Sequence, residues 1–514
     1  MTNASTALSS FSSAGWVSKV SVKPMASPTV RPLVHLRGDT QEQVQATLTQ
    51  LRVVNAGAQR LFRRGGDIVR LTEHPDTGLK VIESVHEVTA LSTELGRQLR
   101  FKTAVKDLNG PPELVVRSIL KSEAAVWGLP PLEAVVHVPF FDAYGVLVQE
   151  NGYHPHQRVW LDKGTLRMPL VPTVPSIAEL ERAKGFLEEL LADCQFEDVP
   201  SRNNAIAGIV TPHVREMIQE HVPMTLIMAQ RPGAGKTTLA RIIGKLAAPG
   251  PLPTLPEATS EEEWRKRILS VLRTQPRVVF VDNLNQPLDS SPLAGLITLE
   301  VFQDRALGGN QLESHRNRAL WMFTANNPQV SPELQRRTSL VVLGSSTASA
   351  QNRSYLKDDL FGWLEEQRGE LLWAIFTLVQ HWVVSGKAPG TVHESGMRDY
   401  SQVLGGILET AGFGGVLENM EQVKTAAGSS EEEEQILMHE WILKFGTAEV
   451  TATQIATLLT EHEIYPMSLS SHRRNVVGQM LSKLTGYIAH GYIVRKRKDK
   501  ANHRSKYWLE LLPV

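Results

Sequence analysis

Short runs of consecutive apolar residues alternate, in the middle of the chain, with segments whose apolar residues recur at helical spacing. The runs fall at 226–229, 278–281, 319–323 and 340–343. Runs of this length are typical of strands that are buried on both faces of a parallel sheet. Between them, Leu239, Ile242 and Ile243 have helical spacing, and so do the apolar residues of 264–272. The alternation predicts an α/β core built on a parallel sheet.

Composition and proline positions divide the remainder of the chain into domains. Residues 1–35 are rich in Ser, Thr and Ala and contain no acid. They predict a disordered tail rather than a transit peptide, because Arg31 is the first arginine. Short helices and strands with frequent turns predict an α+β domain at 36–172. A proline-rich linker then leads into the α/β core, which we place at 173–345. Helical apolar spacing predicts a helical domain at 346–428.

The last part of the chain, 429–514, has a pattern of its own. Helices are expected at about 431–445, from Thr453 and at about 470–484, followed by strands at 492–497 and 506–511. Helices followed by a terminal hairpin are the element order of a winged helix. The predicted fold class is therefore multidomain α/β, with an N-terminal α+β domain, a parallel-sheet core, a helical domain and a C-terminal winged helix.

A glycine-rich segment joins the first apolar run of the core to the helix that follows. Glycines let the backbone fold around a phosphate with its N–H groups pointing inward, and the helix N-terminus favours negative charge. A lysine and a threonine at the start of the helix would reach the β- and γ-phosphates and hold Mg²⁺. The segment predicts a phosphate-binding loop for ATP, although Gln230 stands where the usual motif has its first glycine. The loop residues are Pro232, Gly233, Ala234, Gly235, Lys236, Thr237 and Thr238.

Asp282 ends the second apolar run, about fifty residues after the phosphate loop. The carboxyl ends of parallel strands meet at one edge of a sheet, so Asp282 is expected to share the Mg²⁺ with Thr237. The next residue, Asn283, stands where ATPases usually carry a glutamate that polarises the attacking water. An amide orients a water but cannot take its proton, so hydrolysis is either slow or assisted by another acid, such as Asp289 or Glu300.

Further polar residues follow the later runs. Asn326 comes after the third strand, where it is expected to contact the γ-phosphate or the attacking water, whereas Asn327 favours a turn. Arg336 and Arg337 precede the fourth strand. Either arginine suits a finger that reaches the nucleotide of a neighbouring subunit.

The motifs Gly-Ala-Gly-Lys-Thr, Val-Asp-Asn, Thr-Ala-Asn-Asn-Pro and Arg-Arg, in this order, resemble those of AAA+ ATPases of the superfamily 3 helicase type. The similarity is to the helicase half of phage and plasmid primase-helicases, and closer still to actinobacterial mobile-element ATPases, which share stretches such as RLFRRGGDIVRL (60–71) and VDNLNQPLDS (281–290). The resemblance implies a ring-forming, ATP-driven DNA translocase, with the helical domain as the lid of the ATPase core.

In such helicases, basic residues between the second and third motifs face DNA in the pore. The matching residues here are Arg305, Arg316 and Arg318, around a turn at Gly308 and Gly309. Solvated surface arginines are the alternative interpretation.

The C-terminal segment 472–506 holds ten Lys or Arg residues and one acid, in a chain with 54 basic and 54 acidic residues overall. In a neutral protein such a patch indicates a phosphate-binding surface. Arg473 and Arg474 are expected on a helix that enters a DNA groove, and the wing would contact the backbone through Arg495, Lys496, Arg497 and Lys498. A wing that contacts protein is the alternative.

The overall composition, 42% hydrophobic and 21% charged, is ordinary for a water-soluble chain. One cysteine, Cys194, fits a reducing cytoplasm, and no apolar run is long enough to span a membrane. Residues 36–172 carry no Asp-x-Asp pair of the primase kind, so a separate primase-polymerase is a candidate partner.

Together these features predict a cytoplasmic, homo-oligomeric, hexameric, ATP- and Mg²⁺-dependent DNA helicase or translocase that serves replication of a phage- or plasmid-type element. An ATP-switched DNA-binding regulator that does not unwind DNA is the alternative, and an ATP-gated defence component is another.

Overall fold

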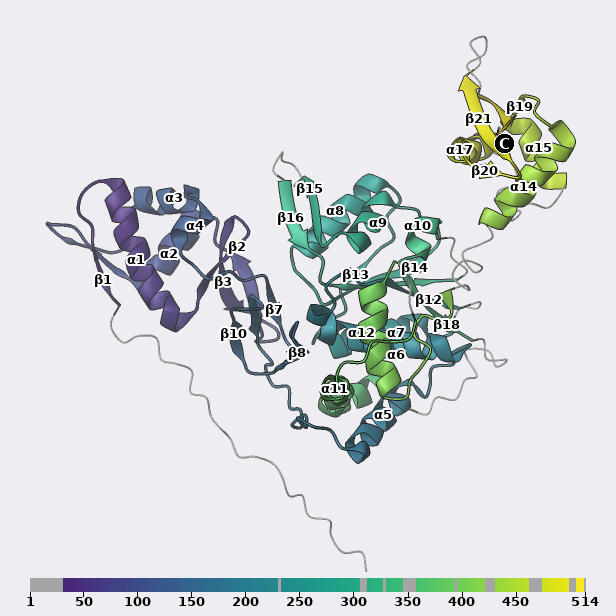
Figure 1. Cartoon of the computed structure of the whole chain (residues 1–514). Coiled ribbons are helices and arrows are strands. Elements are labelled where there is room, and N and C mark those ends of the chain that lie inside the picture. The colour runs from purple at the N-terminus through teal and green to yellow at the C-terminus, as the bar shows by residue number, and fades with distance from the viewer. Residues whose placement is uncertain are drawn as a thin grey trace, which may run out of the picture. The chain divides into compact units, whose positions relative to one another are not determined.

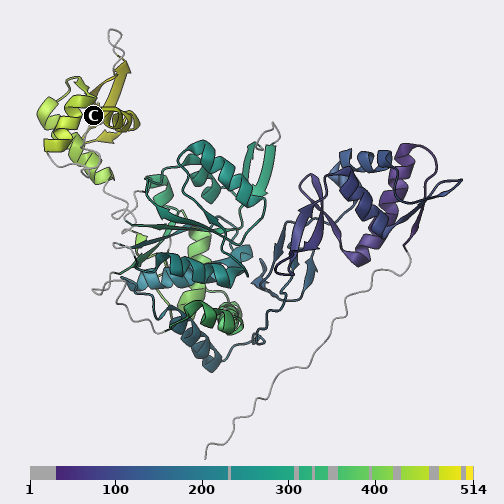
Figure 2. The same ribbon diagram turned by 180° about the vertical axis from the view of Figure 1, so that it is seen from behind.

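The structure is a computed structural model. It describes residues 31–229, 233–305, 312–326, 330–344, 357–392, 396–420, 430–461, 474–498 and 505–512. The fold is multidomain and α/β (Figures 1 and 2). Contacts divide the chain into two compact units. The first extends to Val135 and includes Gly152–Asp162, and the second comprises Val136–Asn151 and the chain from Lys163 onward.

The first unit combines three small sheets with helices, as expected for an α+β domain. The sheet orders are β1-β5-β6, β2-β3-β4 and β10-β11-β7. The elements are β1 (Leu33–His35), α1 (Thr40–Ala58), β2 (Leu61–Arg64), β3 (Asp67–Glu73), β4 (Lys80–Ser84), α2 (Val88–Gln98), β5 (Arg100–Lys102), β6 (Asp107–Leu108), α3 (Glu113–Lys121), α4 (Ala124–Trp127), β7 (Ala134–Val136), β10 (Gly152–His154) and β11 (Val159–Leu161).

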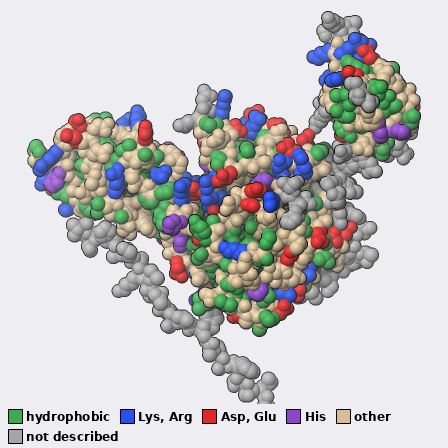
Figure 3. Space-filling model, viewed as in Figure 1, with side chains coloured by type: hydrophobic (Ala, Val, Ile, Leu, Met, Phe, Trp, Pro, Cys, Tyr) green, Lys and Arg blue, Asp and Glu red, His purple; other side chains and the backbone are tan. Residues whose placement is uncertain are grey.

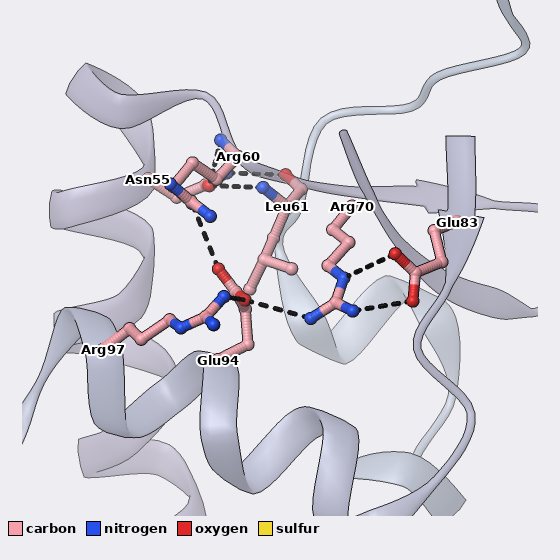
Figure 4. A network of polar contacts seen from close by, with 7 residues as sticks. All are labelled: Asn55, Arg60, Leu61, Arg70, Glu83, Glu94 and Arg97. Carbon is pink, nitrogen blue, oxygen red and sulfur yellow. Dashed lines mark hydrogen bonds and ion pairs between the residues drawn. The ribbon is translucent and has the colours of Figure 1, made fainter. Parts of the chain in front are cut away.

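A buried carboxylate ties helix α2 to the β2-β3-β4 sheet of this unit. The Glu94 side chain is fully buried and pairs with Arg60 at 3.1 Å and with Arg70 and Arg97 at 3.4 Å each (Figure 4). Arg70 also binds Glu83 on β4, and this hydrogen bond is the main reason that the pKa of Arg70 is raised. An unpaired buried charge would cost several kcal/mol, so the arginines are what allow Glu94 to be buried.

The second unit is built around five parallel strands in the order β13-β14-β17-β12-β18. The strands are β12 (Met224–Ala229), β13 (Thr254–Leu255), β14 (Val278–Leu284), β17 (Leu320–Ala325) and β18 (Thr338–Leu343). Every residue of β12, β17 and β18 is buried, which explains their continuous apolar runs.

Helices cover both faces of this sheet. α8 and α9 lie on one face, and α6, α7, α11 and α12 on the other (Figures 1 and 2). The helical elements of the core are α5 (Ile177–Leu191), α6 (Val199–Val214), η1 (Arg215–Met217), α7 (Lys236–Ala247), α8 (Glu261–Leu272), α9 (Ser291–Thr298), α10 (Pro332–Gln335), α11 (Leu360–Val384) and α12 (Arg398–Thr410). A two-stranded hairpin, β15 (Val301–Arg305) and β16 (Leu312–Arg316), extends from the side that carries α8 and α9. Within the described residues, no helix combines the length and apolarity that a membrane span requires.

Residues 136–151, which the sequence pattern assigns to the N-terminal domain, belong to the second unit instead. The segment forms the hairpin of β8 (Phe140–Phe141) and β9 (Leu147–Val148). Phe141 is fully buried, with its ring 6.1 Å from that of Phe376 on α11, and Val138 joins the same core. Long-range packing of this kind leaves no periodic signal in so short a segment.

The C-terminal residues have their own hydrophobic core, which includes Leu437, Trp441, Leu458, Leu481 and Leu509. A four-stranded sheet in the order β19-β22-β21-β20 packs with three helices. The elements are α14 (Ser430–Phe445), β19 (Val450–Thr451), α15 (Ala452–Glu461), α17 (Arg474–Lys483), β20 (Ile488–Ala489), β21 (Tyr492–Lys498) and β22 (Ser505–Leu511).

Close packing of α11 and α12 depends on a glycine. A Cβ at Gly406 would overlap the carbonyl oxygen of Ala388 and lie 2.7 Å from the Nε1 of Trp382. That indole N–H donates to the same carbonyl at 2.7 Å, so neither group is free to move away. At Gly185, inside α5, a Cβ would meet nothing within 4 Å.

We therefore expect Gly406→Ala to destabilise the second unit by about 1–3 kcal/mol, because the added methyl group overpacks a rigid contact. Gly185→Ala should stabilise it by about 0.5–1 kcal/mol, because alanine is the better helix former. Urea unfolding followed by tryptophan fluorescence measures both changes. Equal effects from the two substitutions would contradict the close packing at Gly406.

Candidate functional site

The connection from β12 to α7 is shaped by two glycines with left-handed backbone. Gly233 has a φ of 79° and Gly235 a φ of 96°, a region that residues with a Cβ rarely adopt. Gly235 is the N-cap of α7, which begins at Lys236. The N-terminal N–H groups of this helix consequently lie at the carboxyl edge of the sheet, directly after β12. Gln230 and Pro232 lie outside the described residues.

Lys236 and Asn326 come together at this edge, because β12 and β17 are neighbours. The Lys236 Nζ donates a hydrogen bond to the Asn326 Oδ1 at 2.5 Å. The Lys236 side chain is largely buried, and this burial lowers the pKa of its ammonium, while the nearby Asp282 opposes the shift. The Lys236 ammonium is shielded from water and bonded to an amide oxygen, so it can bind an anion at this edge of the sheet.

Thr237 and Asp282 also meet there. The Thr237 hydroxyl lies 3.1 Å from Oδ1 and 3.3 Å from Oδ2 of Asp282. A hydroxyl and a carboxylate side by side form an all-oxygen donor set that suits a hard divalent cation such as Mg²⁺, which is held by one or two protein ligands plus phosphate. The residues present thus fit a magnesium–phosphate group at the start of α7.

Thr324, the fifth residue of β17, was not singled out from the sequence. Its fully buried hydroxyl donates to Asp282 Oδ1 at 2.5 Å and accepts the backbone N–H of Asn283 at 2.7 Å. A threonine inside an apolar strand is common, so the sequence alone does not indicate this role. The role follows from the position of Thr324 opposite residues 282–283 of β14, where the pairing of the two strands is irregular.

Asn283 sits where the pairing of β14 with β17 shifts register, between Val281 and Leu284. Its φ is 57°, a left-handed conformation that asparagine tolerates better than most residues. Bulges near active sites re-aim a side chain. The Asn283 amide Nδ2 contacts the Asn285 Oδ1 at 3.4 Å, and the Asn285 amide donates to the Asn283 carbonyl at 2.7 Å.

Of the two acids that were considered as substitutes for the missing glutamate, Glu300 is engaged elsewhere. It pairs with Arg316 at 3.2 Å, at the base of the β15–β16 hairpin. Asp289 lies in the segment between β14 and α9, where its backbone N–H bonds the Pro287 carbonyl at 3.1 Å.

Arg336 and Arg337 lie at the opposite edge of the sheet from the phosphate loop. They precede β18, and the Arg337 carbonyl accepts the backbone N–H of Met224, the first residue of β12. The length of β12, roughly 17 Å, separates them from the loop. The Arg337 guanidinium donates to the backbone carbonyl of Glu333 at 2.7 Å and lies 3.7 Å from the Glu333 carboxylate. The Arg336 side chain is exposed.

The three arginines considered for DNA contact are in different environments. Arg305 is exposed at the end of β15, and Arg316 pairs with Glu300 at the base of the hairpin. Arg318 lies beyond the hairpin, with a mostly buried side chain that pairs with Glu216 at 2.7 Å. Gly308 and Gly309 are outside the described residues. DNA contact by these arginines stays a prediction.

The hairpin itself is anchored to α8. Arg273, the residue after this helix, makes two hydrogen bonds to the Glu313 carboxylate of β16, at 2.9 and 2.6 Å. The Arg273 guanidinium is the main cause that lowers the pKa of Glu313 to about 2, with a smaller contribution from His315. Because the folded pKa is depressed, the ion pair is complete above about pH 4.5 and is lost as the pH falls toward 2.

The basic residues of β21 are exposed and gather at one end of the C-terminal sheet (Figure 3). Arg495 pairs with Glu510 at 2.6 Å, and Arg497 with Glu449 at 2.7 Å. Lys496 donates to the Ser482 hydroxyl at 2.7 Å, and Lys498 is exposed at the strand end. Arg473 lies outside the described residues, and Arg474 begins α17. DNA binding by this surface also stays a prediction.

No protein-family model matches the chain. No curated protein matches it either. Among solved structures, the A form apo structure of the NrS-1 C-terminal region has a TM-score of 0.36 and 11% identity, over 86% of this chain and 96% of that one. A second A form apo structure of that region has a TM-score of 0.31 and 12% identity, over 78% and 82% of the two chains. Similarity at this level decides neither fold nor function, so the function is inferred from the residues of this chain.

We expect Thr324→Val to destabilise the second unit by about 1–3 kcal/mol, because it leaves the Asn283 N–H without its acceptor and removes one of the two hydroxyl groups that bond Asp282. Thr324→Ser keeps the hydroxyl and should cost only about 0.8 kcal/mol for the lost methyl group. Chemical unfolding of the full-length chain measures both. If valine proves as stable as serine, the hydroxyl does not hold the edge together.

Proposed function

We propose that this chain is an ATPase of the AAA+ type that hydrolyses ATP to translocate on or unwind DNA during replication of a mobile genetic element. One observation carries the proposal: Lys236, Thr237, Asp282 and Asn326 converge at the carboxyl edge of a parallel sheet, beside a helix N-terminus. In open α/β sheets this edge is where ligands bind.

Each of these residues has a distinct part in the proposed reaction. Lys236 and the N–H groups at the start of α7 would bind the β- and γ-phosphates, and Thr237 and Asp282 would hold Mg²⁺. The bound metal would neutralise charge that develops on the phosphate oxygens. Asn326, positioned by its hydrogen bond from Lys236, would contact the γ-phosphate.

Assembly into a ring would complete the site. Arg336 is exposed at the amino edge of the sheet and so cannot reach the phosphate loop of its own subunit. In a head-to-tail ring the amino edge of one subunit can face the carboxyl edge of the next. An arginine supplied in this way stabilises the transition state of phosphoryl transfer. A hexamer is the form that the sequence resemblance implies.

The DNA track would be formed by basic residues of two elements. The hairpin carries Arg305 and Arg316, and the C-terminal β21 carries exposed Lys496 and Lys498. Arg316, Arg495 and Arg497 are paired with acids, so they would contribute less to phosphate binding unless DNA displaces those acids.

A second function, an ATP-switched DNA-binding regulator without unwinding, is favoured by one observation. The residue after Asp282 is an amide whose side chain contacts Asn285, and an amide cannot accept a proton from water. Such a protein would bind ATP tightly and turn it over slowly.

A strand-displacement assay on forked DNA distinguishes these functions. We expect the wild type to unwind DNA with ATP and Mg²⁺, and Lys236→Ala to lose unwinding and nucleotide binding. Lys245→Ala, which removes a lysine of the same helix that pairs with Glu365 at 3.2 Å, is the matched control and should unwind normally. ATP-dependent DNA binding without displacement by the wild type would refute the helicase in favour of the switch.

Mixing two inactive variants tests the action of Arg336 in a neighbouring subunit. Lys236→Ala and Arg336→Ala should each abolish ATP hydrolysis alone. Their mixture should recover part of it, because some interfaces then combine an intact Lys236 with an intact Arg336. Arg336→Ala protein must still bind ATP. No recovery in mixed oligomers of confirmed composition would contradict a shared site.

A further inference from the structure

Glu257 bonds the segment that directly follows Asn283, the residue that stands where ATPases usually carry a glutamate. The short strand β13 runs parallel to β14, with Leu255 opposite Val281. Glu257 is two residues beyond Leu255, and Asn283 is two residues beyond Val281. Parallel strands emerge at the same edge, so both side chains belong to the edge where Asp282 stands.

Hydrogen bonds position the Glu257 carboxylate there. It accepts the backbone N–H of Asn285, at 3.1 and 3.2 Å to its two oxygens, and that of Gln286 at 2.9 Å. Asn285 in turn bonds the carbonyl of Asn283. Hydrogen bonds therefore link the Glu257 carboxylate to the Asn283 carbonyl through one residue, Asn285.

The contacts of the Glu257 carboxylate differ from those of Asp282 and Glu300. The Asp282 carboxylate accepts hydrogen bonds from the Thr237 and Thr324 hydroxyls, and Glu300 forms an ion pair with Arg316. Within the described part of the chain, Glu257 forms no ion pair with a lysine or arginine and is half-buried. A carboxylate has about four lone-pair positions, so two N–H donors leave room for a water.

We propose that Glu257 is the general base of the ATPase reaction and takes the role that Asn283 cannot fill. The inference rests on the proposed function. As the water oxygen forms its bond to the γ-phosphorus, Glu257 accepts the water proton. The bond between the γ-phosphorus and the bridging oxygen breaks, its electron pair stays on ADP, and the proton then passes from Glu257 to the phosphate product.

Asn283 keeps a separate role in this arrangement. Its amide orients the water by hydrogen bonds, while the base approaches from the neighbouring strand. Asn283 lies on β14 and Glu257 lies two residues beyond β13, so the placement of both groups depends on the parallel pairing of these strands.

Glu257→Gln tests the proposal, because glutamine keeps the shape and can still accept the N–H bonds of Asn285 and Gln286. We expect the kcat for ATP to fall by about 10²–10⁴-fold, the range for loss of a general base. The affinity for a fluorescent ATP analogue should be unchanged. Glu261→Gln, which removes an exposed acid at the start of α8, is the matched control and should hydrolyse ATP normally.

A rescue variant separates catalysis from positioning. The double variant Glu257→Gln, Asn283→Glu restores a carboxylate at the same edge and should recover part of the kcat. If Glu257 had only a structural role, the added carboxylate would recover no kcat. If the wild type hydrolyses ATP and Glu257→Gln does so equally fast, the base lies elsewhere. If the wild type binds ATP through Lys236 but does not hydrolyse it with DNA present, the proposed function fails as well, and the binding data identify the switch.

Discussion

The hydroxyl of Thr324 joins two neighbouring strands at the edge where the candidate site is formed. It donates to the Asp282 carboxylate and accepts the N–H of Asn283, so it fixes the register shift that places both residues. Asp282 then meets Thr237 across the sheet edge, and Lys236 meets Asn326. Because the Thr324 hydroxyl is fully buried, loss of either of its hydrogen bonds would cost stability.

The parallel sheet also separates the two halves of the proposed reaction. The candidate phosphate-binding groups lie at the carboxyl edge, and Arg336 lies at the amino edge, a strand length away. Under the proposed function, a neighbouring subunit would complete the site. Oligomerisation would then be part of the chemistry rather than an addition to it.

Helix α8 connects the two functional regions of the core. The segment that carries Glu257 leads into its N-terminus, where Ser260 caps the helix. Arg273, just past its C-terminus, anchors the hairpin through Glu313. Helix α8 thus links the segment that carries the candidate base to the candidate DNA hairpin.

Local pattern was sufficient for the elements whose signal is contained in a few neighbouring residues. The buried strands and the glycine turn before α7 follow from apolar runs and from the backbone freedom of glycine. The edge location of Asp282 and Asn326 also followed, because parallel strands end together. Thr324 and Glu257 could not be found this way, since each acts on residues that are distant in the chain.

The sequence by itself thus determined which residue types stand at the ends of the strands. Only the tertiary structure decided which of them meet. Strand order and the bulge at Asn283 are set by long-range packing and pairing. These brought Glu257 to the backbone of Asn285 and Gln286, buried Arg318 against Glu216 and placed residues 136–151 in the second unit. Contacts between distant segments leave no periodic trace, so no local pattern can encode them.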